Sequence, residues 1–318
     1  MATPLLRIGT RGSPLALIQA EAIRSALADA HPALAEPGAL EIVTIRTTGD
    51  VVRDRTLAAI GGKGLFTKEI EAALLAREID LAVHSLKDMA TQLPDGLAIA
   101  CHLPRADPRD AFVSARAKRL LDLPQGAVVG SSALRRQAQL LRARPDLRIV
   151  PLRGNVETRL GKVTDGKVDA TLLAVAGLAR LGVESRITEI LSTDLMLPAP
   201  AQGTIAVETR SGDDRVIRYL KPLDDAPTAA RSTAERTLLA VLDGSCRTPI
   251  AALAEIDGHG RLTLHARIIR PDGTQCHEAR LSGAVADTAR IGHEIGARLR
   301  AEAGPGFFDL PIPEGTPV

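Results

Sequence analysis

Four polar side chains follow a short apolar run in the first third of the sequence. The stretch 80–88 (DLAVHSLKD) begins like a buried strand and then presents His84, Ser85, Lys87 and Asp88. In α/β folds, ligands and catalytic groups collect at the carboxyl ends of parallel strands. Taken alone, an adjacent lysine and aspartate are more typical of a solvated surface ion pair. His84 could face such a site or merely end the strand.

Basic side chains recur near other predicted strand ends and helix starts. Arg11 and Ser13 stand at a strand-to-helix corner, where a helix N-terminus can bind an anion. An exposed arginine in an ordinary loop explains that corner equally well. Further groups of this kind are Ser131 and Ser132 with Arg135 and Arg136, then Arg153 and Gly154, Arg159, and Arg180. Because arginine binds carboxylates and phosphates bidentately, the pattern favours an anionic ligand over randomly placed, solvated charges.

A glycine-rich loop, 61–66 (GGKGLF), leads into a predicted helix whose buried row would be Phe66, Ile70 and Ala73. The loop lacks the spacing and the final Ser/Thr of a phosphate-binding Walker loop, so an NTPase is rejected. A flexible lid that carries the cation of Lys63 remains open.

The three cysteines lie far apart and have no metal-ligand spacing, so no metal site is expected. Cys101 and Cys276 fall on predicted strands, and Cys101 is expected to be a buried structural thiol. Cys246 lies in a loop just past a helix end, beside Arg247, where a thiol can be exposed and have a lowered pKa. A single cysteine is more often structural, so this position alone is a weak signal.

Composition restricts the class of partner. The chain has 318 residues, a net charge of +2 and only 2% aromatic residues, so nucleic-acid binding is not expected. No stretch is long and apolar enough to span a membrane, and the N-terminus has no apolar core of signal-peptide length. Together with the sparse cysteines, this predicts a cytoplasmic protein without a disulfide framework.

Periodicity predicts an α/β fold of two lobes that form a clamshell, with the ligand between them, followed by a small α+β domain. Helical spacing of Leu15, Ile18, Ala22 and Ala26 predicts a helix over 14–30, capped by Ser13 and with Pro14 at its first position. The chain crosses between the lobes twice, near 103–109 and 197–203. Strands are expected at 5–10, 41–46, 80–88, 97–103, 111–114, 127–130, 148–152, 169–174, 204–209, 250–256, 261–269 and 274–282.

Taken together, the segments resemble the hydroxymethylbilane synthase family, also called porphobilinogen deaminase. The resemblance covers nearly the whole chain. It rests on 7–16 (RIGTRGSPLA), 61–69 (GGKGLFTKE), 82–88 (AVHSLKD), 107–112 (DPRDAF), 134–137 (LRRQ), 152–160 (LRGNVETRL), 173–178 (LAVAGL) and the Cys246 loop.

The resemblance implies two lobes of the type II periplasmic-binding-protein kind and a C-terminal α+β domain with a three-stranded antiparallel sheet. The implied boundaries are 1–103 with 204–222 for domain 1, 104–203 for domain 2 and 223–318 for domain 3. It also implies a monomeric cytoplasmic transferase of tetrapyrrole (haem) biosynthesis.

The implied enzyme joins four porphobilinogen molecules head to tail on a dipyrromethane cofactor bound through a thioether to Cys246. Each step releases ammonia and leaves an electron-poor azafulvene cation, which needs a carboxylate nearby. Hydrolysis then releases hydroxymethylbilane. The partners implied are therefore porphobilinogen and the growing polypyrrole chain, whose rings carry acetate and propionate groups.

The resemblance assigns Asp88, Lys87 and Arg11 to catalysis, with Asp88 as the catalytic carboxylate. It assigns to cofactor and substrate binding Ser13, Lys63, Phe66, Ser85, Ser131, Ser132, Arg135, Arg136, Arg153, Gly154, Arg159, Arg180 and Gln202. Arg11, Arg153 and Arg159 could instead act mainly in elongation or release. Ala133 departs from the family pattern by removing a hydroxyl, and Met89-Ala90 changes the loop after the acid.

The alternative from another class is a non-catalytic clamshell receptor for a small anionic ligand. Such a receptor explains neither Cys246 nor the third domain.

Overall fold

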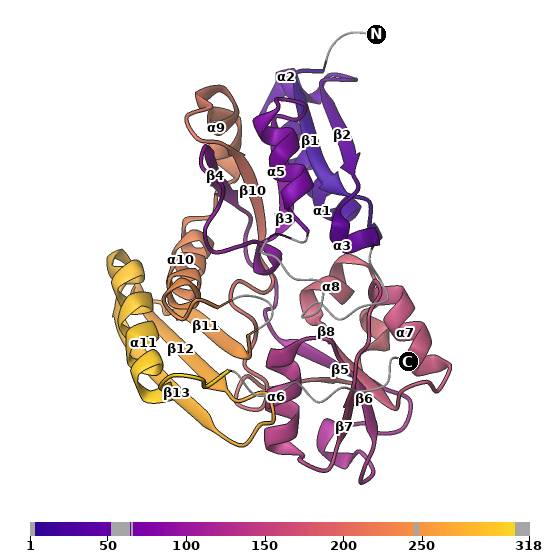
Figure 1. The fold of residues 1–318 in the computed structure, drawn as a ribbon. Coiled ribbons are helices and arrows are strands. Elements are labelled where there is room, and N and C mark those ends of the chain that lie inside the picture. The colour runs from indigo at the N-terminus through magenta and orange to yellow at the C-terminus, as the bar shows by residue number, and fades with distance from the viewer. Residues whose placement is uncertain (1–3, 52–63, 65, 245–247, 309–318) are drawn as a thin grey trace. The chain divides into compact units, whose positions relative to one another are not determined.

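The computed structural model describes residues 4–51, 64, 66–244 and 248–308 (Figure 1). Within them the chain forms two compact units. The first holds 4–51, 66–106 and 204–229, and the second holds 107–203 together with most of the C-terminal part from residue 230 on. Each unit is described separately below.

The first unit contains a five-stranded sheet in the order β2-β1-β3-β10-β4. The first three of these strands are parallel, and β10 runs antiparallel to both of its neighbours. The strands are β1 (Leu6–Arg11), β2 (Leu40–Ile45), β3 (Leu81–Ser85), β4 (Leu97–His102) and β10 (Ile205–Arg210). The helices of this unit are α1 (Pro14–Ala30), α2 (Pro32–Ala35), α3 (Thr48–Val51), α5 (Lys68–Leu75), α9 (Asp214–Leu220) and the first turn of α10.

Helix α1 confirms the predicted span 14–30 and its cap, and the structure shows which of its faces is buried. Ser13 Oγ accepts the Ala16 N–H at 3.3 Å, and Pro14 occupies the first helical position. Ile18 is 39% exposed. The buried face instead consists of Ala16, Gln19, Ala20, Ile23 and Leu27. Two rows at helical spacing were present in the sequence, and packing against the sheet selected the one that contains a polar residue.

The second unit repeats this strand order in the sheet β7-β6-β8-β5-β9. Again three strands are parallel, and the fourth, β5, is antiparallel to its neighbours β8 and β9. The strands are β5 (Asp110–Ser114), β6 (Val128–Gly130), β7 (Arg148–Val150), β8 (Ala170–Ala174) and the short β9 (Glu189–Ile190). The helices are α6 (Leu134–Ala143), α7 (Val156–Thr164) and α8 (Val175–Arg180).

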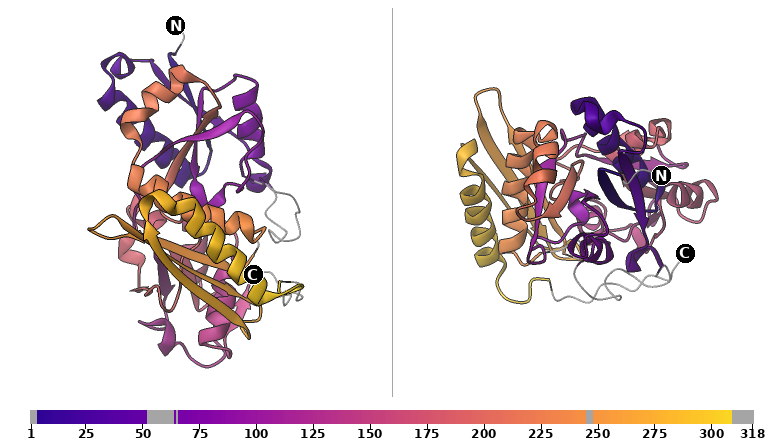
Figure 2. Two further views of the ribbon diagram at one scale, coloured as in Figure 1. Left: turned by 90° about the vertical axis from the view of Figure 1, so that its left-hand side faces the viewer. Right: turned by 90° about the horizontal axis from the view of Figure 1, so that it is seen from above.

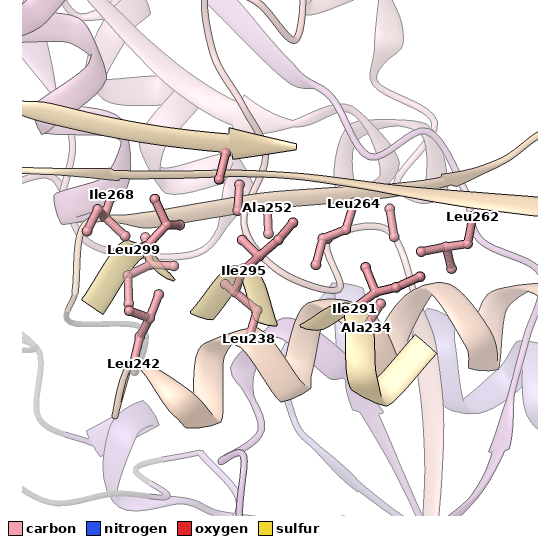
Figure 3. Packing of buried hydrophobic residues seen from close by; sticks show 14 of the residues in the cluster. Ala234, Leu238, Leu242, Ala252, Leu262, Leu264, Ile268, Ile291, Ile295 and Leu299 are labelled. Atoms are coloured by element: carbon pink, nitrogen blue, oxygen red, sulfur yellow. The ribbon is translucent and has the colours of Figure 1, made fainter. Parts of the chain in front are cut away.

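The C-terminal part of the second unit is a three-stranded antiparallel sheet, as predicted. It consists of β11 (Ile250–Ile256), β12 (Arg261–Ile269) and β13 (Cys276–Ala284). Helices α10 (Ala226–Val241) and α11 (Thr288–Ala303) accompany it, and α11 lies along the sheet in two views (Figures 1 and 2). The predicted row Ile291, Ile295 and Leu299 is buried and packs with Leu238 and Ala234 of α10 (Figure 3). An aliphatic core with few aromatic residues therefore holds this part together.

Both α/β sheets and the C-terminal sheet confirm the predicted fold class. In the described part of the chain, no helix is long and apolar enough to cross a membrane, and no group of His, Cys, Asp and Glu could hold a metal ion. Cys101 is fully buried, as expected of a structural thiol, and burial raises its pKa to about 12.

Candidate active site

The carboxyl edge of the first sheet carries the acid, the lysine and one arginine of the predicted site. Arg11 ends β1, and the parallel strand β3 ends at Ser85, directly before a 3₁₀ turn, Leu86–Asp88. The Leu86 N–H donates to the Thr204 carbonyl at 3.0 Å, and Leu86 is buried. This anchored turn leaves Lys87 and Asp88 partly exposed. The structure thus places both groups where ligands collect in α/β folds.

Arg11 lies over the ring of Phe66, with its guanidinium carbon 4.2 Å from the ring centroid. The prediction that Phe66 belongs to a buried helical row was wrong: Phe66 precedes α5 and is partly exposed, whereas Ile70 and Ala73 are buried as expected. The aromatic face attracts the cation and limits its motion. Phe66 therefore supports Arg11 directly.

The two serines of this unit that belong to the predicted site, Ser13 and Ser85, both contact α1. Ser13 caps the helix. Gln19, which is buried on α1, donates through its amide to Ser85 Oγ at 2.9 Å, and that hydroxyl donates back to Gln19 Oε1 at 3.2 Å. These bonds fix the end of β3 against the helix. The predicted residues Lys63 and Cys246 lie outside the described residues.

His84 points into the protein, where sequence analysis had left its direction open. Its side chain is 4% exposed, and its Nε2 lies 3.2 Å from Oε2 of Glu208, which is fully buried on β10. Glu71 of α5 is also buried, and burial together with the nearby charge of Glu208 raises its pKa. Sequence analysis missed both glutamates because a single acid inside a predicted strand or helix carries no local signal of a site.

The carboxyl edge of the second sheet gathers the predicted hydroxyls and several predicted cations. Ser131 and Ser132 follow β6, Arg153 and Gly154 follow β7, and Arg180 ends the helix after β8. These three strands are parallel, so their ends meet at one edge. The structure therefore places Ser131, Ser132, Arg153 and Gly154 at this edge, with Arg180 one helix further along the chain.

Local hydrogen bonds hold this edge in shape. Ser132 Oγ donates to the Leu152 carbonyl at 3.0 Å and accepts the Leu152 N–H at 3.1 Å. Arg159 Nε donates to the Gly154 carbonyl at 2.9 Å. Gly154 has φ +118°, and a Cβ there would meet Thr158 side-chain carbons at 2.8 Å, so only glycine fits without movement.

Arg135 and Arg136, here called the arginine pair, share the buried carboxylate of Asp110. Arg135 Nη1 donates to Asp110 Oδ2 at 2.7 Å, and Arg136 donates to Oδ1 from Nη2 at 2.7 Å and from Nε at 3.1 Å. Burial alone would raise the pKa of Asp110, but the two guanidiniums outweigh burial and lower it. The cluster keeps an excess of one positive charge because its second cation has no other acid in these contacts.

The two arginines differ in how many of their guanidinium nitrogens donate hydrogen bonds. Arg136 Nη1 also donates to the Leu172 carbonyl at 2.8 Å, so all three of its nitrogens are engaged. Arg135 Nη1 donates to the Leu197 carbonyl at 2.7 Å, while within the described ranges no hydrogen bond engages its Nε or Nη2. Arg135 therefore has donors to offer an anion.

Gln202 and Arg180 meet the backbone of the two crossover segments. Gln202 is fully buried and donates from Nε2 to the Pro108 carbonyl at 2.6 Å and to Asp110 Oδ1 at 3.0 Å. Arg180 Nη2 donates to the Gly203 carbonyl at 2.7 Å, and burial lowers the pKa of its guanidinium.

Asp110 is a residue that sequence analysis missed at this corner. It lies within segment 107–112, between two basic neighbourhoods, where nothing in the local sequence marks it as the counter-charge of Arg135 and Arg136. Its place at the first position of β5, opposite Ala174 at the end of β8, could have been found only from the pairing of the strands.

Comparison with known proteins decides the family. Residues 6–218 match the family described as "Porphobilinogen deaminase, dipyromethane cofactor binding domain", and residues 229–301 match "Porphobilinogen deaminase, C-terminal domain". The chain belongs to the porphobilinogen deaminase family. The resemblance noted from the sequence motifs is thereby confirmed.

Curated relatives of this family cover nearly all of the chain. "Porphobilinogen deaminase" of Nitrobacter hamburgensis is 54% identical over 96% of this chain and 96% of its own length. The protein of the same name from Paracoccus denitrificans is 56% identical with the same coverage of both chains. "Porphobilinogen deaminase, chloroplastic" of Oryza sativa is 52% identical over 96% of this chain and 86% of its own.

Among solved structures, a putative methionine-binding lipoprotein from Bacillus subtilis is similar with a TM-score of 0.43 at 17% identity. It covers 69% of this chain and 89% of its own.

Proposed function

We propose that the chain is a hydroxymethylbilane synthase, which joins four porphobilinogen molecules head to tail with loss of ammonia and then releases the linear product by hydrolysis. The observation that carries this proposal is the match of both porphobilinogen deaminase domains, over 6–218 and 229–301. The edges of the two sheets supply an acid and a set of cations that suit such a substrate. The chain is accordingly a transferase of tetrapyrrole biosynthesis.

A dipyrromethane cofactor fits the donors of the second unit. The name of the matched domain includes this cofactor. A group that carries acetate and propionate requires cationic donors, and the arginine pair brings one positive charge more than Asp110 neutralises. Cys246 is the proposed attachment residue. When bound, the cofactor supplies the covalent anchor on which the chain of pyrroles grows.

Asp88 is the proposed catalytic carboxylate. Positive charge develops on the pyrrole as ammonia leaves, and a fixed carboxylate stabilises it more than water does. The same oxygen atoms can hold a pyrrole N–H proton. Asp88 suits this role because its turn is anchored by the buried Leu86 while the carboxylate itself is partly exposed.

Lys87 and Arg11, assigned with Asp88 to catalysis, are proposed to hold carboxylates of the substrate beside it. Arg11 can be positioned for this by its contact with Phe66. The further proposed binding groups are Ser13, Lys63 and Ser85 of the first unit, and Ser131, Ser132, the arginine pair, Arg153, Gly154, Arg159, Arg180 and Gln202 of the second.

Arg135 is the member of the pair best suited to meet a ligand directly, since its Nε and Nη2 have no hydrogen bond among the described residues. Arg136 contributes its charge and holds Asp110. Removing a charged hydrogen bond to a ligand carboxylate should cost about 1.5–3 kcal/mol of binding.

The proposal extends to the location, oligomeric state and domain boundaries of the protein. We propose that the chain acts as a cytoplasmic monomer with domain boundaries at 1–103 with 204–222, at 104–203 and at 223–318. Porphobilinogen and the growing chain are its partners, and neither nucleic acid nor a membrane is needed for activity.

Stoichiometry tests the reaction. Purified protein incubated with porphobilinogen should release one ammonia for each porphobilinogen consumed and should consume four for each hydroxymethylbilane formed. Asp88→Asn is the matched control, since it keeps the size of the side chain and removes the charge. Binding of porphobilinogen without consumption would contradict the proposal and favour the receptor.

A further inference from the structure

A continuous path of buried polar contacts in the second unit joins α10, the helix that precedes Cys246 in the chain, to the arginine pair. It runs from Glu235 on α10 through Ala201 and Gln202 to Asp110. All four residues are at most 1% exposed.

The path begins at a carboxylate that binds two backbone segments. Glu235 Oε2 accepts the Ala201 N–H at 2.5 Å, and its Oε1 accepts the Ala254 N–H of β11 at 2.7 Å. Ala201 has φ +61°, a left-handed conformation that is unfavourable for any residue with a Cβ. The hydrogen bond that the Ala201 N–H donates to the Glu235 carboxylate therefore stabilises a backbone conformation that the segment would otherwise leave.

The next residue carries the path to the arginines. The Gln202 N–H donates to the Ala199 carbonyl at 3.0 Å, which closes the turn. Its side-chain amide then donates to the Pro108 carbonyl and to Asp110 Oδ1. The orientation of Ala201 thus sets where the Gln202 amide reaches Asp110.

The same segment is anchored at its other end. The Leu197 carbonyl accepts from Arg135 Nη1 at 2.7 Å and from Gln139 Nε2 at 3.0 Å, and the Leu197 N–H donates to Gln139 Oε1 at 2.9 Å. The Ala252 N–H of β11 donates to the Pro198 carbonyl at 3.0 Å. Residues 197–202, here called the strut, are therefore held on one side by α6 and on the other by β11 and α10.

We propose that Glu235 is a positioning residue that acts through the strut. It fixes the arginine pair relative to the C-terminal helix and sheet, so that the guanidiniums meet ligand carboxylates in one geometry. Glu235 itself touches no reacting group. This inference rests on the proposed function in one respect, namely that Arg135 contacts carboxylates of the incoming substrate in addition to the cofactor carboxylates assigned to the arginine pair.

A double-mutant cycle with the cofactor-loaded enzyme tests the proposal. The variants are Glu235→Gln, Arg135→Lys and the double variant, with KM for porphobilinogen, kcat and the thermal midpoint measured for each. Because the arginines bind groups remote from the reacting bond, Glu235→Gln should raise KM about tenfold and change kcat less than about twofold. In the Arg135→Lys background, Glu235→Gln should raise KM by less than about a further twofold, because the effects of residues that act through one another are not additive.

Asp169→Asn is the matched control. Asp169 also accepts a backbone N–H, from Val128 at 2.8 Å, and an arginine N–H, from Arg116 at 2.7 Å, but it has no contact with the strut. It should leave KM unchanged in either background.

The outcomes separate the two claims. Fully additive losses of Glu235→Gln and Arg135→Lys, or a lowered thermal midpoint with an unchanged KM, would overturn the role of Glu235 alone. An unchanged KM in Arg135→Lys would overturn the ligand contact of Arg135 and the inference with it.

A second pair of variants covers the case in which Glu235→Gln fails to fold. Gln139→Leu removes both hydrogen bonds to Leu197 and should show the same non-additivity with Arg135→Lys. Ala201→Gly, combined with Glu235→Gln, should restore part of the lost affinity, since glycine adopts a positive φ without strain. Additive behaviour of Gln139→Leu would contradict the proposed role of the strut.

Discussion

The two five-stranded sheets share one strand order but hold their arginines in different ways. In the first sheet Arg11 lies over the aromatic face of Phe66, a contact between a cation and a neutral ring. In the second sheet the arginine pair is bound to the buried carboxylate of Asp110. An aromatic face limits the motion of the first cation, whereas a buried carboxylate holds the two cations of the pair. The same strand order can therefore hold its arginines through an aromatic ring or through a buried acid.

The acids of the two sheets, Asp88 and Asp110, differ in how far they are exposed. Asp88 stands on a turn at the carboxyl end of β3 and is partly exposed, while Asp110 is fully buried at the start of β5. One is available to a ligand, and the other is occupied by protein donors. The comparison predicts that replacing Asp88 impairs turnover and that replacing Asp110 impairs folding.

Asp110→Asn should have the largest effect. Loss of the charge leaves two buried guanidiniums without their counter-ion, and breaking a buried ion pair in this way costs roughly 3–5 kcal/mol of unfolding free energy. Chemical denaturation measures this, with Asp169→Asn as the less buried control. A loss below about 1 kcal/mol would show that the arginine pair does not depend on Asp110.

Asp88→Asn should reduce kcat by roughly 10²–10³-fold, the usual cost of removing one electrostatic stabiliser of a transition state. Its unfolding free energy should change by no more than about 0.5 kcal/mol, because the side chain is partly exposed. Steady-state kinetics and denaturation of the same preparation check both statements. Retained turnover, or a marked loss of stability, would erase the contrast with Asp110.

The pH dependence of stability should have opposite signs for the buried acids of the two units. The raised pKa of Glu71 means that the folded state holds this proton more tightly than the unfolded state, so stability is lost as pH rises through the folded pKa. The lowered pKa of Asp110 means that its stabilising effect is present above the unfolded pKa and is lost only as pH falls.

Glu71→Gln should therefore stabilise the protein more at about pH 7 than at about pH 4, relative to the parent. The charged and titratable neighbours of Glu71 are Glu208 of β10, His84 of β3 and Glu69 of its own helix, and the nearby Thr67 hydroxyl opposes the rise of its pKa. Denaturation at both pH values measures the difference. An equal effect at both would contradict the raised pKa.

Phe66→Leu should have the smallest effect, since it removes only the cation–π attraction on Arg11, worth about 0.5–1 kcal/mol. The expected change is an increase in KM for porphobilinogen of at most about fivefold, with Phe66→Tyr, which keeps the aromatic face, close to the parent. A far larger increase would mean that Phe66 contacts the ligand itself.

The start of α1 and the inward face of α11 followed from the sequence because short-range signals determine them. Pro14 after Ser13 marked the start of α1, and Ile291, Ile295 and Leu299 marked the inward face of α11. The buried face of α1 could not be chosen in this way, since the buried Gln19 bonds to Ser85 of a distant strand and no local pattern shows that contact.

The counter-charges were beyond sequence analysis for a similar reason. Asp110 meets residues 25 and 26 positions away, and Glu208 meets His84 at a separation of 124. No periodicity or local motif in the sequence indicates either of these contacts. The strand order brings these partners together, and that order depends on tertiary packing.

The intact mass of freshly purified, active protein tests the central claim most directly. We predict an excess over the sequence mass that corresponds to one dipyrromethane, together with a positive Ehrlich colour reaction, and the loss of both in Cys246→Ala. An unmodified mass in protein that turns over porphobilinogen, or normal turnover by Cys246→Ala, would contradict the account.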